Sequence, residues 1–462
     1  MKVYAYRCKC QHEDGEWLSS EGVPDRMETQ KLRFVHLSDI HFNNRNAQFG
    51  SDPDRELRNA VVRDIAERRQ CLGDIDAILV SGDIAYSGQR SEYLDAAEWL
   101  DQICNSAGCG TEAVFLCPGN HDVDQTVIKN NPLIQDGHDA IRRGNTMYER
   151  DEALSQRLKQ PDARALFYAP IATYNEFAAR YQSSFFADER TFVWETDFPL
   201  NDGTMLRLRG LNTALLSGLK DEEKSLFLGT RAWTLPRLDG VEYMTMAHHP
   251  PSWLADGRET ERALNSRSRI QLFGHEHDQR VDLGRDWIKL FAGSINPHRS
   301  ESNWRPGYNL IEVHVESGPP RRLIVEVHAR EWQGHPLQFR SIEDIEHDPV
   351  HRLEIRLPDL PATMLHNLAV AGIAAGQEPN PALEPMEAIA VDTQHRFRVT
   401  VYRFFRLSLS KKNEIVGHLK LAEESDSRLT DVERFKLSLV RARETNQMDA
   451  LEALIDKLEK AQ

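Results

Sequence analysis

Clusters of Asp, His and Asn, side chains that commonly bind divalent metal ions, recur between Asp39 and His277. The first cluster is Asp39-Ile40-His41. Alternate residues at the end of a strand can point to one side, so this carboxylate and this imidazole can bind one ion. The second cluster is Gly82-Asp83, where glycine permits a sharp turn. The two oxygens of the Asp83 carboxylate can then bridge two ions.

The third cluster, Gly119-Asn120-His121-Asp122, combines a ligand with a proton donor. Asn120 offers a neutral amide oxygen, which is an uncommon metal ligand and therefore informative. His121 can donate a hydrogen bond to a phosphoryl oxygen or protonate a leaving alkoxide. Asp122 is expected to hold the His121 imidazole in its orientation, as carboxylates often do.

Two histidine pairs complete the set: His248-His249, which precedes Pro250, and His275-Glu276-His277. In the first pair, one histidine should bind a metal while its neighbour faces away or lines the pocket. The second pair repeats the alternate spacing and can serve two adjacent ions. Mixed His, Asp and Asn ligands favour Mn²⁺, Fe²⁺ or Zn²⁺. Two such ions about 3.5–4 Å apart clamp an in-line phosphoryl displacement and lower the pKa of a bound water.

Short apolar runs precede these clusters, as expected of buried strands that end where the chemistry begins. The runs are LRFVHL before Ser38, AILV before Ser81, AVFLC before Pro118, YMTMA before His248 and IQLF before Gly274. Helical patterns lie between some of them, at 57–70 and 92–104. Strand and helix alternate, so the region is predicted to be an α/β sandwich.

The order D-x-H, G-D, G-N-H-D, a histidine before a proline, and G-H-x-H resembles the calcineurin-like metallophosphoesterase superfamily over about residues 32–330. The resemblance implies a four-layer α/β sandwich of two mixed sheets flanked by helices. It places Asp39, His41 and His277 on the first metal and Asn120, His248 and His275 on the second, with Asp83 bridging. His121 becomes the transition-state stabiliser or proton donor. His248 is preferred to His249 because the family uses the first histidine of such a pair.

The segments LSDIHF, SGDIAYSG and PGNHDVD are similar to bacterial members related to class III cyclic-nucleotide phosphodiesterases. This similarity implies a phosphodiesterase that acts on nucleotides through a metal-bridging hydroxide. One alternative is a DNA or RNA nuclease that serves as an effector in bacterial defence, although the net charge of −15 disfavours long nucleic acids. The other alternative is a scaffold without catalysis, which the complete set of ligand types disfavours.

The remaining chain suggests further units around this domain. Residues 1–31 form an N-terminal extension, in which Cys8, Cys10 and His12 provide fewer ligands than the four of a usual zinc site. Residues 124–205 are expected to be an insertion that caps the site. Residues 331–400 are expected to connect the domain, through a linker at 376–385, to a small helical domain at 401–462.

The C-terminal stretch has a helical pattern and suggests a protein partner. Thr430 and Glu433 form a capping box before Phe435, Leu439 and Ala442, which share one helix face. The piece from Phe404 onward is similar to the small effector-associated modules of bacterial defence systems, which pair with a partner module.

Composition predicts a cytoplasmic protein that does not enter membranes. Six cysteines in 462 residues give no disulfide framework. The first residues lack a secretory signal, and no run approaches the roughly 18 apolar residues of a membrane span.

Overall fold

The computed structural model describes residues 30–43, 54–185, 193–296, 305–316, 318–344, 346–362, 364 and 386–460. Cys8, Cys10, His12 and the predicted linker at 376–385 lie outside the described residues. Among the helices of the described ranges, none is long and apolar enough to cross a membrane.

The first sheet is built around β1 (Leu32–Leu37), and every residue of that strand except Arg33 is buried. On one side it pairs in parallel with β2 (Ala77–Val80), which pairs in parallel with β3 (Val114–Leu116). On the other side it pairs antiparallel with β10 (Gly307–Glu316), which is followed by β11 (Arg322–Gly334). The three parallel strands therefore end at one edge.

The second sheet has the order β4-β5-β6-β7-β9-β8. Its strands are β4 (Val193–Pro199), β5 (Met205–Leu211), β6 (Val241–Met246), β7 (Ser268–Phe273), β9 (Ile288–Phe291) and β8 (Arg280–Leu283). Strands β5, β6, β7 and β9 run parallel, while β4 and β8 are antiparallel edge strands.

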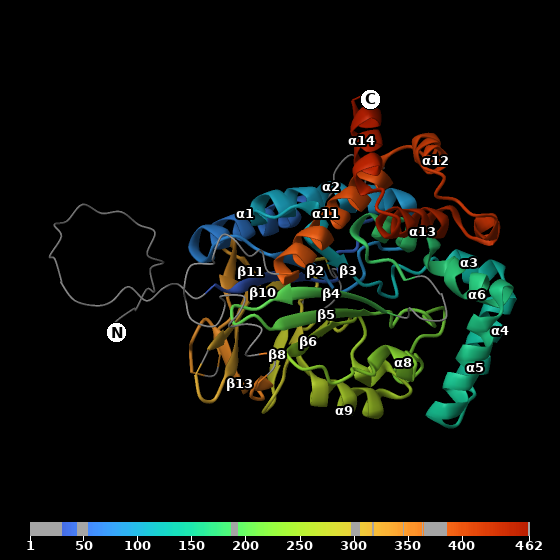
Figure 1. Cartoon of the computed structure of the whole chain (residues 1–462). Helices are drawn as coiled ribbons and strands as arrows, with labels where there is room; N and C mark the ends of the chain where they lie inside the picture. Colours follow the sequence, from blue (N-terminus) through green and yellow to red (C-terminus); the bar gives the residue numbers. More distant parts are fainter. Residues whose placement is uncertain are drawn as a thin grey trace.

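Helices flank both sheets. In Figure 1, α1 (Arg55–Leu72) and α2 (Arg90–Ala107) lie above the first sheet, and α8 (Thr230–Trp233) and α9 (Gly257–Arg267) lie below the second. Between the sheets, the rings of Phe34 and Phe198 meet edge to face with centroids 5.0 Å apart. The predicted α/β sandwich of two mixed sheets flanked by helices is confirmed.

The segment at 124–205 is helical in its first part only. It contains α3 (Gln125–Asn130), α4 (Pro132–Arg142), α5 (Met147–Lys159), α6 (Pro161–Tyr168) and α7 (Ala172–Ala178). The prediction of one insertion was wrong at its end, because β4 belongs to the second sheet. As an edge strand β4 is only partly buried, and its sequence VWETDFP therefore lacks the apolar run by which the other strands were recognised.

The expected connecting segment at 331–400 also contains strands. The end of β11 pairs with β12 (Leu337–Ser341), and its beginning pairs with β13 (His351–Arg356). Both are antiparallel strands with mostly polar or partly exposed residues, so their sequences look like loop. Strands β12 and β13 of that segment thus extend the first sheet instead of linking two domains.

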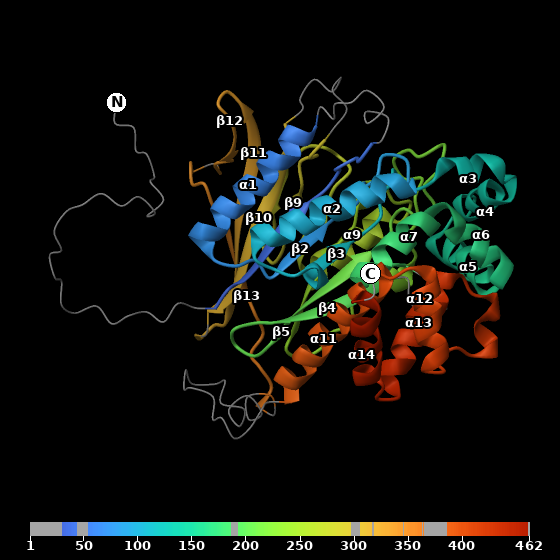
Figure 2. The same cartoon turned by 90° about the horizontal axis from the view of Figure 1, so that it is seen from above.

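The C-terminal helices are α11 (Met386–Arg406), α12 (Leu409–His418), α13 (Asp431–Glu444) and α14 (Met448–Glu459), which form one group beside the sandwich (Figure 2). Phe435, Leu439 and Ala442 are buried in their common core, as predicted. The capping box is present, with the Thr430 hydroxyl accepting from the Glu433 N–H. Helix α11 starts earlier than the predicted boundary at 401.

Helix α11 is attached to the first sheet through Arg398, which is buried. Its guanidinium donates to the carbonyls of Glu112 (2.5 Å), Val114 (3.0 Å) and Tyr181 (2.9 Å), and it lies 4.1 Å from the Phe115 ring centroid. Burial lowers the pKa of Arg398 to about 9. The C-terminal helices therefore contact β3, the strand that leads to Asn120 and His121.

Candidate metal centre

The predicted clusters come together because both sheets direct the carboxyl ends of their parallel strands to one place. Asp39 and His41 follow β1, Asp83 follows β2, and Asn120 follows β3. The histidine pairs follow β6 and β7 of the second sheet. Backbone hydrogen bonds tie these loops together, with the Ile40 N–H donating to the Asp83 carbonyl at 2.9 Å.

One group of ligand atoms comes from Asp39, His41 and His277, and these atoms lie within 4.8 Å of one another. The Nε2 of His277 is 3.2 Å from the Oδ1 of Asp39. The other oxygen of Asp39 accepts the His275 backbone N–H at 3.1 Å. Asp39 is fully buried, and its carboxylate is therefore held in one orientation by the loop that follows β7.

A second group surrounds the amide oxygen of Asn120. The Nε2 of His248 lies 3.2 Å from this oxygen, and the Nδ1 of His275 lies 3.0 Å from it. The Nε2 of His249 is also 3.2 Å away. His249 thus lines the site beside His248, one of the two outcomes expected for this pair.

Asp83 lies between the two groups. Its Oδ2 is 3.3 Å from the Nε2 of His41 and 3.2 Å from the Nε2 of His248. Its Oδ1 accepts the His121 backbone N–H at 2.7 Å. One buried carboxylate therefore faces an imidazole from each group, which is the arrangement that a bridging ligand requires.

Backbone carbonyls orient two of these imidazoles from behind. The Nδ1 of His41 is 3.0 Å from the Asn296 carbonyl, and the Nδ1 of His248 is 3.0 Å from the Ser81 carbonyl. A carbonyl can only accept, so each Nδ1 carries a proton and Nε2 is the ring nitrogen that faces the site. Such contacts are typical of metal-binding histidines.

His121 lies beside the first group, and its ligand atom, that of His41 and that of Asp83 lie within 4.8 Å of one another. Its Nδ1 lies 2.8 Å from the Tyr86 carbonyl, and its ring meets that of His41 edge to face, with centroids 4.6 Å apart. The contact with Tyr86 again places the proton on Nδ1.

The expectation that Asp122 orients His121 was wrong. The fully buried Asp122 carboxylate accepts the backbone N–H groups of Ala85 (3.0 Å) and Gly119 (2.9 Å) and the Tyr93 hydroxyl (2.9 Å). Asp122 therefore joins the loops after β2 and β3. The Tyr86 carbonyl, in place of Asp122, orients the His121 ring. A carbonyl partner leaves no sequence signal, because every residue carries one.

The charges of the site depend on one another. Burial raises the pKa of Asp39 and Asp83, but the facing histidines, His248 first among them, outweigh it and hold both pKa values below their usual range. For His248, burial alone would lower the pKa, yet Asp83 and Asp39 raise it to about 9. Burial and the His248 charge lower the pKa of His275 to about 4. These two carboxylates therefore stay ionised and can bind cations.

The backbone of the site is strained at five residues with positive φ: Asp39 (53°), His41 (52°), Asp83 (51°), His275 (70°) and His277 (55°). Such conformations are costly for residues other than glycine and occur mostly where a function requires them. The glycines next to the ligands allow close approach. A Cβ on Gly119 would lie 2.1 Å from the Oδ1 of Asp83, so only glycine fits there.

The comparison with known families agrees with this geometry. Residues 32–279, more than half of the chain, match the model of calcineurin-like phosphoesterases. The chain belongs to this family. Residues 396–457 match the GTPase-associated adaptor domain, so the phosphoesterase domain is followed by an adaptor domain made of the C-terminal helices. Within the family, the buried His and Asp groups of this chain are suited to a dinuclear metal site.

The chain is also similar, at low identity, to individual proteins and solved structures. The uncharacterized metallophosphoesterase-like protein YydB of Bacillus subtilis is 23% identical over 305 residues, which are 62% of this chain and 58% of that protein. Among solved structures, the purple acid phosphatase PPD1 of yellow lupin is 13% identical, with a TM-score of 0.38 over 71% of this chain and 54% of that chain. GAP50 of Plasmodium is 11% identical, with a TM-score of 0.37 over 76% and 98%.

Proposed function

We propose that this phosphoesterase is a two-metal phosphodiesterase that acts on nucleotides. The observation that carries the proposal is the position of Asp83, whose Oδ2 faces His41 on one side and His248 on the other. Asp39, His41, His277 and Asp83 would hold the first ion, and Asp83, Asn120, His248 and His275 the second. The ions, Mn²⁺, Fe²⁺ or Zn²⁺ by the donor set, would polarise the phosphoryl group and lower the pKa of a water.

The proposal gives His121 the task of protonating the leaving alkoxide. Its backbone N–H is anchored to Asp83, and its Nδ1 is anchored to the Tyr86 carbonyl. The remaining ring nitrogen, Nε2, is then the atom that carries the mobile proton when the ring is charged. Both anchors fix the distance between this donor and the proposed bridging carboxylate.

The neighbourhood of His249 supports the choice of His248 as the ligand. The Thr213 hydroxyl accepts the His249 backbone N–H at 3.1 Å and lies 3.0 Å from its Nδ1. The hydroxyl proton of Thr213 is then available to Nδ1 of His249. The neutral His249 ring consequently carries its own proton on Nε2, which faces the Asn120 oxygen. We therefore assign His249 to positioning the Asn120 amide, with no lone pair left for an ion.

The adaptor domain suggests a protein partner associated with a GTPase. Helix α11 contacts β3 through Arg398, so binding to the adaptor would act on the strand that precedes Asn120. The test is whether a GTPase co-elutes with the full chain in gel filtration. Co-elution of proteins without any GTPase would contradict this part of the proposal.

The catalytic proposal is tested with Mn²⁺-loaded protein on bis-p-nitrophenyl phosphate, p-nitrophenyl phosphate, cyclic nucleotides, and single- and double-stranded DNA. Cleavage of the diester and of a cyclic nucleotide is expected. Cleavage of monoesters only would exclude a phosphodiesterase, and cleavage of DNA without cyclic nucleotides would favour the nuclease alternative.

Two variants separate metal binding from proton transfer. Asp83→Asn should lose bound metal and activity together, because one oxygen of the proposed bridge is replaced by an amide. His121→Gln should keep its metal content while kcat falls by about 10²–10⁴. His347→Gln, an exposed histidine paired with Glu343, is the matched control. Full metal content and activity in Asp83→Asn would refute the bridging role.

A further inference from the structure

A cavity lies at the opposite end of the second sheet from the metal centre. It has a volume of about 260 Å³ and is lined where β6 and β7 begin, by residues that include Gly240, Val241 and Arg267. The proposed ligands His248 and His275 follow the other ends of the same strands. A strand of six residues spans roughly 20 Å, so the two places are separate.

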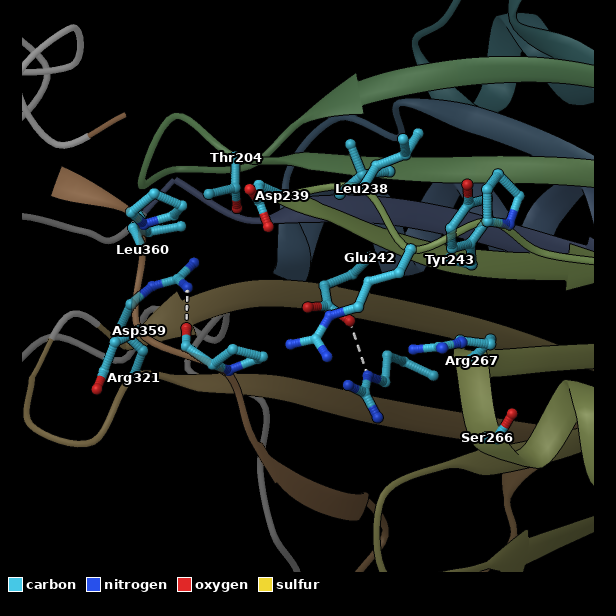
Figure 3. A pocket seen from close by; sticks show the side chains of 17 residues that line it. Thr204, Leu238, Asp239, Glu242, Tyr243, Ser266, Arg267, Arg321, Asp359 and Leu360 are labelled. Atoms are coloured by element: carbon cyan, nitrogen blue, oxygen red, sulfur yellow. Dashed lines mark hydrogen bonds and ion pairs between the residues drawn. The ribbon is translucent and has the colours of Figure 1, made fainter. Parts of the chain in front are cut away.

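Charged side chains of both signs line this cavity. Arg237, Arg267, Arg269 and Arg321 line it, together with three carboxylates, Asp239, Glu242 and Asp359. Figure 3 shows Arg267 and Arg321 on opposite sides of Glu242. Arg269 is paired with Glu242 and Arg321 is paired with Asp202, so the positive charge that remains for a ligand is that of Arg237 and Arg267.

Two of the arginines are held in place by the protein. The Nε of Arg269 donates to Glu242 at 2.7 Å. Arg321 donates to Asp202 at 2.5 Å and to the Pro358 carbonyl at 2.8 Å. Each guanidinium has five N–H donors, so these contacts fix the side chains without using all of their donors. Less conformational entropy remains to be lost when a ligand binds.

The other two arginines have no such anchor. Arg237 and Arg267 are exposed, and within the described part of the chain neither has an ion pair or side-chain hydrogen bond. Among the lining carboxylates, Glu242 is already paired with Arg269. Asp239 and Asp359 are exposed and solvated at the rim. Two guanidinium groups are therefore available to an incoming ligand.

The walls of the cavity are partly apolar. Pro236, Leu238, Leu360 and Pro361 contribute to the lining, and Tyr243 is buried beneath it. Guanidinium forks match the oxygens of phosphate, and the apolar walls suit an organic group attached to that phosphate. We propose that this cavity is a second, non-catalytic site for a small organic phosphate of the size of a nucleoside monophosphate.

The experiment is calorimetric titration of the metal-loaded full chain with 5′-AMP, compared with the double variant Arg237→Ala/Arg267→Ala. The metal centre contributes equally to both proteins, so their difference isolates the cavity. The wild type should bind one more AMP than the variant, or bind it at least tenfold more tightly at this site. Arg143→Ala, which removes the exposed arginine directly after α4, is the control and should bind like the wild type.

Titrations with adenosine and with inorganic phosphate test separately how the two parts of AMP contribute to its binding. Inorganic phosphate should compete with AMP, and adenosine should bind at least tenfold more weakly than AMP. Equal binding of AMP by the wild type and the double variant would overturn the proposal, as would equal binding of adenosine and AMP. Thermal melting verifies that the variants fold, which is expected because both substituted side chains are exposed.

Discussion

Thr213→Val tests how the protein holds the second half of the metal centre. The substitution keeps the shape of the side chain and removes the hydroxyl that contacts the His249 backbone N–H and ring Nδ1. His249 then loses the contact that places its proton on Nε2. The Asn120 oxygen, 3.2 Å from that nitrogen, loses a fixed neighbour. The hydrogen-bond contacts of the Thr213 hydroxyl are with His249 and not with Asn120.

The magnitude follows from the contacts that are lost. A buried N–H left without an acceptor costs about 1–3 kcal/mol of folding free energy. Loss of a contact that orients metal ligands typically weakens metal affinity by about 10–100-fold. Thr213→Val should therefore weaken one of two binding steps by that factor, because only the group around Asn120 depends on His249.

The assay is competition for Mn²⁺ with a chelator of known affinity, combined with the metal content of the dialysed protein. Thr260→Val is a matched control: Thr260 is also buried, and its hydroxyl has no hydrogen-bond partner among the described residues. It should leave both binding steps unchanged. The reasoning is refuted if Thr213→Val binds both ions as tightly as wild type while His249→Gln loses one ion entirely, since His249 would then be a ligand.

Three further predictions concern the scaffold. Gly119→Ala should lose bound metal, measured by elemental analysis, because its Cβ would lie 2.1 Å from Asp83; full occupancy would contradict the close approach. Arg398→Met should lower the free energy of unfolding, measured in urea, by about 1–3 kcal/mol, because three carbonyls lose their hydrogen-bond donor. Removal of the buried guanidinium charge offsets part of this loss. An unchanged free energy of unfolding would mean that these contacts contribute nothing to stability. Burial lowers the pKa of His138 to about 4. As the pH falls, this histidine therefore takes up a proton in the unfolded protein at a higher pH than in the folded protein. The free energy of unfolding, measured in urea, should drop by about 3 kcal/mol between pH 6.5 and 4. In His138→Phe this free energy should depend less on pH over that range. An equally steep dependence in the variant would exclude His138 as the cause.

The elements that carry the motifs were predictable because their strands are buried on both faces. LRFVHL, AILV and IQLF are nearly continuous apolar runs, and each forms a strand that ends at a cluster. The edge strands β4, β12 and β13 were not predicted. An edge strand has neighbours on fewer sides, so its sequence can alternate or stay polar, and such a pattern resembles a loop.

The residues that support the site from behind its motifs were less predictable than the motifs themselves. Asp122 was assigned to His121 because they are adjacent in sequence, yet its partners come from the loop after β2 and from Tyr93 on α2. Thr213 lies 36 residues before His249 and has no motif of its own. Arg398 lies more than 200 residues from its nearest carbonyl partner in sequence. Pairing over such distances depends on how the sheets stack, which no local pattern records.

The residue types and their spacing by themselves located the strands and the clusters at their ends, because apolar runs form buried strands whose polar ends meet at one edge. The resemblance of these clusters to the calcineurin-like family implied the two mixed sheets and the eight side chains proposed for the reaction. Tertiary structure alone decided that the Tyr86 carbonyl orients His121, that His249 points at Asn120, and that four arginines from separate elements line one cavity. Each of these depends on distances between segments far apart in the chain, and only the packing of the two sheets sets those distances.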